Sequence, residues 1–325
     1  MLGSGRYRPN SGVTISQQRN NKSMKIPQSP LLLPQNRILI YSEKDFDFKH
    51  YNDARPLYPD SSYNTFLNYH RHIEVNVIKF AMNVGCGSGF VGLKLTEYFT
   101  RVLGTDLSET IILNNRINTI SAAKSNIDFV AAPAKKSPES VQPHSVDMVT
   151  AAEAYHWMDM DKFFQETARI LKPHGTLSKL NLEFSYDSSQ KNHGESYERF
   201  LGPYFENPGH NRYRSEFEGV NQPADLFFDV ICHYYHPEQH ERLHTTLLIE
   251  KTITLRFYKG CAISWSGYHN WKRTHLDKPD TVDWFIDKLQ ILGIDLDTPI
   301  NIVFPTVYTL ARRKALKTKC NLTVL

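Results

Sequence analysis

The sequence predicts an α/β fold, a doubly wound and mostly parallel sheet with helices on both faces. Three observations predict this class. Apolar segments of strand length alternate with amphipathic segments of helix length along residues 61–184. A glycine-rich stretch, NVGCGSGFVG at 83–92, separates the first strand segment from the helix segment after it. A chain of 325 residues, 40% hydrophobic and 22% charged, can bury the core that such a sheet requires.

The first helix and the first strand lead into the glycine turn. A helix is expected over 61–73, because Asp60 and Ser61 are good N-cap residues at its start. The apolar run 77–84 predicts a buried strand. Residues 90–99 have apolar side chains at helical spacing, so the turn connects a strand to a helix.

The alternation continues to residue 184. Residues 101–106 predict a short strand that ends in an acid, and Pro173 and Gly175 end an amphipathic helix. The other expected elements are helices at 108–120 and 160–171 and strands at 127–132, 145–152 and 175–184. Ligands of such sheets lie outside the carboxyl ends of the strands, so the side chains at these ends should converge on one crevice.

The pattern changes after this alternation. The chain becomes polar and weakly periodic from 185 to about 223, and we interpret 185–280 as an insertion that covers the crevice. The elements expected beyond 223 are a strand at 226–236, a helix at 280–293, and a strand pair or one bent strand at 300–313 around Pro305.

Both ends of the chain are expected to lie outside a folded domain that spans residues 43–314. Residues 1–42 contain no Asp or Glu and several arginines, a composition also found in organelle transit peptides. Their prolines break any amphipathic helix, so a disordered tail is the better interpretation. Residues 315–325 are expected to form a basic, solvated tail.

Composition excludes several classes of protein. The net charge of +4 is small and dispersed, which argues against nucleic acid as a partner. The four cysteines form no CxxC pair, which argues against a zinc ribbon or a disulfide framework and suits a reducing compartment. No apolar run approaches the roughly 18 residues that span a bilayer. We therefore expect a cytoplasmic protein that binds neither nucleic acid nor membranes.

The glycine turn fits two ligand registers. G-x-G-x-x-G at 87–92, with Asp106 at the end of the next strand, matches the dinucleotide fingerprint, in which the pyrophosphate binds at a helix N-terminus. N-x-G-x-G-x-G at 83–89 also suits S-adenosylmethionine, because alternate glycines let the turn pass close under the ligand. An acid at the next strand end is then placed to take both ribose hydroxyls. Spacing alone leaves both ligands open.

The motifs beyond the turn favour the second register. AAEAYHWMDMDKFF at 151–164 and ARILKPHGTL at 168–177, together with NVGCGSG and GTDLS, resemble class I S-adenosylmethionine-dependent methyltransferases, and more narrowly the fungal branch related to trans-aconitate methyltransferase. The resemblance covers about residues 48–314. It implies a seven-stranded Rossmann-like sheet with an inserted substrate-covering cap, a small-molecule acceptor, S-adenosyl-L-methionine as cofactor and S-adenosyl-L-homocysteine as product.

The resemblance also implies roles for particular residues. The cofactor would be bound by the turn, by the two strand ends that follow it and by the start of the AEAYHW motif. Those residues are Asn83, Gly85, Cys86, Gly87, Ser88, Gly89, Asp106, Leu107, Ala132, Pro133, Ala134 and Glu153. His156 would be catalytic, and the acceptor would contact Tyr51, Arg55, Tyr155, Trp157 and Trp265.

The chain departs from the family pattern in three ways, one of which is that residues 185–225 do not align with it. Asn83 stands where an acid is common, so an ionic contact with the ammonium of the ligand is lost. Lys135 and Lys136 stand where an acidic pair is common. These departures keep a non-catalytic S-adenosylmethionine-binding protein as one alternative, and a nicotinamide-dependent oxidoreductase is the enzymatic one.

The expected reaction is methyl transfer to an oxygen of the acceptor. A carboxylate is ionised near neutral pH and needs no general base. Arg55, Lys272 or Arg273 could orient it through charge-assisted hydrogen bonds. A hydroxyl acceptor would need a base, and His156 is the candidate.

HERLH at 240–244 has the form of a zinc-protease motif, which requires a helix to place both histidines on one face. The preceding segment alternates like a strand, and Pro237 ends it. We interpret these residues as a polar loop and expect no metal site.

Overall fold

The structure is a computed structural model that describes residues 57–72, 79–121, 123–182, 222–234 and 248–315, and the single residues 52, 201 and 204. The predictions for Tyr51, for Arg55, for the N-terminal tail and for HERLH lie outside these residues, as do most of those for 185–247 and for the C-terminal tail. All described residues fall within one unit, Arg37–Leu325. No helix among them is long and apolar enough to cross a membrane.

The central sheet confirms the doubly wound, mostly parallel architecture. Seven strands follow one another in the order β3-β2-β1-β4-β5-β8-β6. β1 to β5 are parallel, and β8 runs antiparallel to both of its neighbours, β5 and β6. The strands are β1 (Phe80–Val84), β2 (Arg101–Asp106), β3 (Ile127–Ala131), β4 (Val146–Ala152), β5 (Leu171–Leu182), β6 (Phe227–Tyr234) and β8 (Pro299–Arg313). The strand order reverses between β1 and β4, which is where ligands bind in open α/β sheets.

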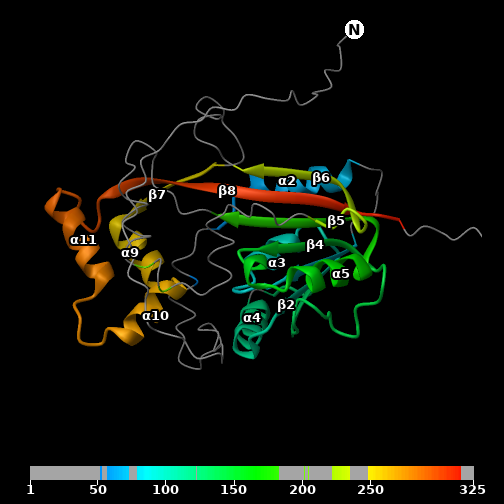
Figure 1. The fold of residues 1–325 in the computed structure, drawn as a ribbon, viewed down its shortest axis with the longest axis horizontal. Helices are drawn as coiled ribbons and strands as arrows, with labels where there is room; N and C mark the ends of the chain where they lie inside the picture. The colour runs from blue at the N-terminus through cyan, green and yellow to red at the C-terminus, as the bar shows by residue number, and fades with distance from the viewer. Residues whose placement is uncertain are drawn as a thin grey trace, which may run out of the picture. The chain divides into compact units, whose positions relative to one another are not determined.

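β8 is one long strand with two different sets of neighbours. From Thr306 onward it pairs with β5 and β6, whereas its first half pairs with an additional strand, β7 (Leu248–Thr254). Pro305, which has no N–H to donate, stands where the partners change. Leu182 ends β5 opposite Thr306, so the first half of β8 and all of β7 extend past the carboxyl end of β5 (Figure 1).

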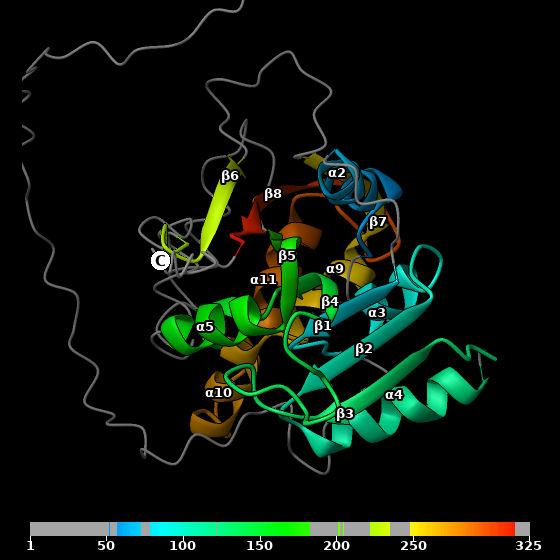
Figure 2. The same cartoon turned by 90° about the vertical axis from the view of Figure 1, so that its right-hand side faces the viewer.

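Helices cover the two faces of the sheet. On one face Phe66, Val91 and Ile112 share a core cluster with residues of β1, β2 and β4. On the other face Phe163 and Phe164 pack against β4 and β5. The helices of the first face are α2 (Asp60–Arg71), α3 (Phe90–Leu95) and α4 (Glu109–Ser121), and α5 (Met160–Ile170) covers the second (Figure 2).

The start of β5 differs from the prediction. The strand begins at Leu171 rather than at 175, and its register with β4 shifts between Val146 and Met148. The helix already ends at Ile170, and Pro173 and Gly175, which were expected to end it, lie within the irregular first part of the strand. A Cβ at Gly175 would lie 2.9 Å from the carbonyl oxygen of Lys172, so the irregularity needs glycine there.

Three further helices form a second, smaller core. α9 (Leu255–Ile263), α10 (Ser266–Thr274) and α11 (Thr281–Ile291) follow β7. We call their buried residues the α9–α11 cluster, which includes Leu255, Trp265, Trp271, Val282 and Ile286. The helix predicted at 280–293 is α11, whose cap Asp280 accepts hydrogen bonds from two backbone N–H groups of the first turn. β7, α9 and α10 were not predicted.

Candidate active site

In the turn between β1 and α3, packing requires glycine at two of the three alternate positions. At the third position a side chain would have room. Gly85, Gly87 and Gly89 all have left-handed φ angles, of 64°, 48° and 76°. A Cβ at Gly85 would lie 2.5 Å from the Cβ of Ala154, and one at Gly89 would lie 2.9 Å from the ring of Phe129. A Cβ at Gly87 would meet no atom of the described residues within 4 Å. The turn therefore leaves open space over Gly87.

Hydrogen bonds between the backbone of the turn and the neighbouring elements fix its shape. The N–H of Cys86 donates to the carbonyl oxygen of Thr105 on β2 at 2.9 Å. The side-chain amide of Asn115 on α4 donates to the carbonyl oxygen of Gly87 at 2.7 Å. Asn115 was not predicted, although a buried asparagine on the inner face of an amphipathic helix is the signal that could have found it.

Asp106 joins the turn to the end of β2. Its carboxylate accepts hydrogen bonds from the backbone N–H groups of Gly87 and Ser108, both at 3.0 Å. Burial raises the pKa of Asp106, while the backbone N–H groups that donate to it act in the opposite direction. Leu107, the next residue, is exposed. A carboxylate held in this way has lone pairs left for hydroxyl groups of a ligand.

The end of β3 lies beside Asp106. The N–H of Ala132 donates to the carbonyl oxygen of Asp106 at 2.9 Å, and Ala132, Pro133 and Ala134 are all half-buried. Lys135 and Lys136, which depart from the family pattern, are exposed.

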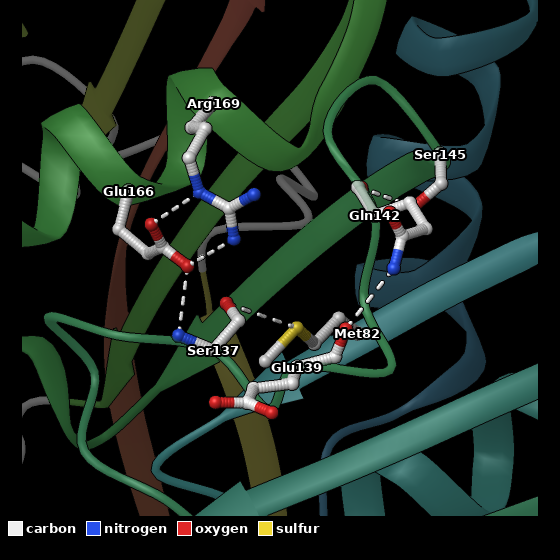
Figure 3. A network of polar contacts seen from close by, with 7 residues as sticks. All are labelled: Met82, Ser137, Glu139, Gln142, Ser145, Glu166 and Arg169. Atoms are coloured by element: carbon white, nitrogen blue, oxygen red, sulfur yellow. Dashed lines mark hydrogen bonds and ion pairs between the residues drawn. The ribbon is translucent and has the colours of Figure 1, made fainter.

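A polar network anchors the segment that follows Ala134 (Figure 3). Glu166 on α5 accepts a hydrogen bond from the N–H of Ser137 and two from the guanidinium of Arg169, all at 2.7 Å. Burial alone would raise the pKa of Glu166, but these donors lower it. The network thus ties the loop after β3 to the helix that precedes β5.

The end of β4 carries a strained residue and a short 3₁₀ helix. Glu153 has a left-handed φ of 50°, and its N–H donates to the carbonyl oxygen of Leu180 at 2.9 Å. The following residues, Tyr155–Trp157, form the 3₁₀ helix. Tyr155 and His156 are buried, and the ring of His156 lies 4.9 Å from that of Trp157, which is half-buried.

A buried lysine lies beneath this 3₁₀ helix. The ammonium of Lys179 on β5 lies 4.9 Å from the ring centre of Tyr155 and 5.2 Å from that of Phe164. Only 1% of Lys179 is exposed, and this burial lowers its pKa to about 7. Sequence analysis missed it, although a single cation within a predicted buried strand was its signal.

Asn83 is held from the side of β4. Its amide nitrogen donates to the Oγ1 of Thr150 at 3.1 Å and to the carbonyl oxygen of Thr150 at 3.4 Å, and only 1% of the residue is exposed. Its Oδ1 has no hydrogen-bond partner among the described residues, and the same is true of the Oγ of Ser88. Both atoms are buried. The Oδ1 can accept a hydrogen bond from a polar ligand, and the Oγ can accept or donate one.

The structure thus brings most of the predicted site residues to the carboxyl ends of neighbouring strands. Cys86 is buried inside the turn, and burial raises the pKa of its thiol. Trp265 packs in the α9–α11 cluster rather than in either core cluster of the sheet. Lys272 forms an ion pair with Asp280 at 2.9 Å. Among the residues that the structure describes, no three His, Cys, Asp or Glu side chains are grouped as a metal site requires.

Comparison with known proteins agrees with this geometry. Residues 82–178, from β1 into β5, match a family model described as a methyltransferase domain. A protein of Saccharomyces cerevisiae named "Probable S-adenosylmethionine-dependent methyltransferase CRG1" is 29% identical over 296 residues, which cover 84% of this chain and 98% of that protein. A methyltransferase candidate of Dictyostelium discoideum is 25% identical over 68% of this chain and 75% of its own length.

A solved structure shows the same fold. It is a candidate type II methyltransferase from Anaeromyxobacter dehalogenans, with a TM-score of 0.61 and 21% sequence identity, over 79% of this chain and 97% of that one. The matched domain and these relatives support the assignment of the chain as an enzyme, a methyltransferase that uses S-adenosylmethionine, and the solved structure shows that it has the fold of such an enzyme.

Proposed function

We propose that this enzyme transfers a methyl group from S-adenosylmethionine to a carboxylate oxygen of a small acceptor. The cofactor site is inferred from the open space over Gly87, which the carboxylate of Asp106 borders on one side. The carboxylate acceptor is supported by the resemblance of the AEAYHW motif to relatives of trans-aconitate methyltransferase.

The residues at the strand ends fit the groups of S-adenosylmethionine. Asp106 would accept hydrogen bonds from the ribose hydroxyls, and exposed Leu107 would cover one face of the adenine. Ala132–Ala134 would lie along the adenine. The Oδ1 of Asn83, which has no partner in the described part of the chain, would accept a hydrogen bond from the ammonium, in place of the ionic contact that an acid provides. The cofactor supplies an electrophilic methyl group on its sulfonium.

The enzyme's own contribution is alignment and exclusion of water. Methyl transfer is an in-line displacement, so the acceptor oxygen, the methyl carbon and the sulfur must lie in one line. A carboxylate is already ionised, so His156 would pack against the acceptor rather than remove a proton. β7 and the first half of β8 extend past the carboxyl end of β5, which supports a cap over this site that keeps water out.

The test is transfer of a labelled methyl group from S-adenosylmethionine to a panel of small carboxylic acids and to the matched alcohols and amines. Methyl esters release methanol in alkali, whereas methyl ethers and N-methyl amines do not. We expect alkali-labile product from the acids only. Alkali-stable product would contradict the carboxylate assignment, and no product from any acceptor would contradict the function.

The His156→Ala variant separates the two kinds of acceptor. With a carboxylate we expect a rate loss of less than about tenfold and no rise of the rate with pH between 6 and 8. With a hydroxyl acceptor a general base is required, and the loss should be roughly 100-fold or more. Binding of S-adenosylhomocysteine by the variant is the control for its fold.

A further inference from the structure

The outer face of α4 carries a row of exposed apolar side chains, which we call the α4 stripe. It consists of Leu113, Ile117 and Ile120, which are 59%, 54% and 80% exposed. Their i, i+4, i+7 spacing places them in one line along the helix. Single exposed aliphatic side chains are common on protein surfaces, but a contiguous row of them marks an interaction surface.

The opposite face of α4 attaches the helix to its own chain. Ile112 packs in the core cluster that includes residues of β1 and β2, and the side-chain amide of Asn115 donates to the carbonyl oxygen of Gly87. Thr119 on the same face is buried as well. Because these contacts hold α4 on the sheet, the fold of one chain does not require the α4 stripe to be apolar.

α4 lies beside β3, the strand at the edge of the sheet (Figure 2). An edge strand can recruit a second chain through its free backbone groups. In the middle of β3, however, side chains already occupy these groups. The N–H of Phe129 donates to the carboxylate of Asp128 at 2.9 Å, and its carbonyl oxygen accepts a hydrogen bond from the Nε of Arg116 at 2.8 Å. A partner at this edge would therefore meet the helix rather than extend the sheet.

Opposite charges flank the two ends of the α4 stripe. Glu109 is the first residue of α4, and Lys124 lies just past its last turn. The N–H of Lys124 donates to the carbonyl oxygen of Thr119 at 3.3 Å, which keeps this residue close to the helix end. Both charged side chains are exposed. The surface around the stripe is therefore negative at one end and positive at the other.

This pattern is complementary to a second copy of itself in the opposite direction. The midpoint between Glu109 and Lys124 in the sequence lies beside Ile117, and the midpoint between Leu113 and Ile120 is the same. In an antiparallel pair of α4 helices, Glu109 would face Lys124 of the other copy. Leu113 would face Ile120, and the two Ile117 side chains would lie beside the two-fold axis. Two-fold interfaces use the same patch on both subunits and require such self-complementarity.

We propose that the chain forms a dimer through antiparallel packing of two α4 stripes. The dimer should be weak, because a helix of this length is only about 20 Å long and 10 Å wide. Stable interfaces bury roughly 800 Å² on each partner, which is more than one helix face provides. We expect a Kd of about 10–100 µM. The inference goes beyond the proposed function and does not depend on the methyl acceptor.

Sedimentation equilibrium of the full chain, from about 5 to 500 µM, measures the association. Ile117→Lys places two ammonium groups beside the two-fold axis and should weaken the dimer at least about tenfold. Ile291→Lys changes another exposed isoleucine, at the end of α11, in the same way. It is the matched control and should leave the Kd unchanged. Urea unfolding of both variants verifies that they remain folded.

Charge variants test the antiparallel arrangement. Glu109→Lys and Lys124→Glu each place like charges at both ends of the paired helices, and each should weaken the dimer by roughly three- to tenfold. A mixture of the two variants brings opposite charges together again at both ends. The mixture should therefore associate as tightly as the wild type.

The outcomes decide the inference without any measurement of methyl transfer, so it and the proposed function can fail separately. A chain that stays monomeric up to about 500 µM overturns the inference, as does a dimer that Ile117→Lys leaves intact. If the mixture of Glu109→Lys and Lys124→Glu associates no better than either variant alone, the antiparallel arrangement is wrong.

Discussion

The carboxyl edge of the parallel strands and the α9–α11 segment are stabilised in different ways. At the edge the contacts that shape the site are partly buried and use the backbone, as in the bond from the Gly87 N–H to Asp106. In the α9–α11 segment an apolar core holds the helices together, and its ion pairs, such as Lys272–Asp280, lie near the surface. We therefore expect the first region to tolerate few substitutions, whereas the second should accept them at its surface.

The largest effect is expected for Gly85→Ala. The new Cβ would lie 2.5 Å from that of Ala154, on a backbone with a φ of 64°. Overpacking and left-handed strain together should lower the free energy of unfolding by about 2–4 kcal/mol. Denaturant unfolding measures this change. A loss below about 1 kcal/mol would mean that the edge adapts as readily as the α9–α11 segment.

Gly87→Ala is the partner experiment at the open position. No described atom lies within 4 Å of the new Cβ, so only the left-handed strain of about 1 kcal/mol should appear in unfolding. The methyl group would occupy the space of the cofactor and weaken S-adenosylhomocysteine by roughly 10- to 100-fold. Titration calorimetry measures the affinity. Unchanged affinity would show that the ligand does not pass over Gly87.

Asp106→Asn tests the acid through two separate measurements, stability and ligand affinity. The amide has one oxygen for the two N–H groups of Gly87 and Ser108, so one of these hydrogen bonds is lost and the free energy of unfolding should fall by about 1–3 kcal/mol. The negatively charged acceptor of the hydrogen bonds from the ribose hydroxyls is also lost. We therefore expect about tenfold weaker binding of S-adenosylhomocysteine. The same affinity in the variant, with lower stability, would assign Asp106 to the turn alone.

The sequence predicted the local parts of the site and missed those that depend on tertiary contacts. The glycine turn and Asp106 could be predicted because strand, turn and helix are adjacent in the chain. Asn115 was missed because its partner Gly87 lies 28 residues away in the sequence, so only its place on the inner face of the helix pointed to it. β7 and α9 have no clear apolar period. Trp265 packs with aromatic residues of its own segment, such as Tyr258, and its contact with the acceptor stays a prediction.

Lys179 makes stability depend on pH. Its folded pKa of about 7 lies below the ordinary value of 10.5, so the unfolded chain binds more protons between these pH values. Stability should therefore rise with pH from 7 towards 10.5, by up to about 1.4 kcal/mol per unit. Lys179→Met removes the titration. It should be more stable than the wild type at pH 7, and its advantage should shrink as pH rises.

Urea unfolding of both proteins at pH 7, 8 and 9 measures this difference. A stability difference that stays constant with pH would mean that the lysine remains charged over the rings of Tyr155 and Phe164. The exposed Lys124→Met is the matched control, because it removes one lysine without burial and should show no such slope.

The smallest effect is expected for Lys272→Ala in α10. Its ion pair with Asp280 lies near the surface, and such pairs contribute less than about 1 kcal/mol. The carboxylate of Asp280 keeps its bonds to Tyr268 and to the first backbone N–H groups of α11, so the cap survives. Lys272 was also a candidate for orienting the acceptor. Because the ammonium of Lys272 is already paired with Asp280, we expect the variant to have an unchanged KM for the best acid of the panel. A KM raised tenfold or more would mean that Lys272 leaves Asp280 to bind the acceptor, and that the α9–α11 segment takes part in the site.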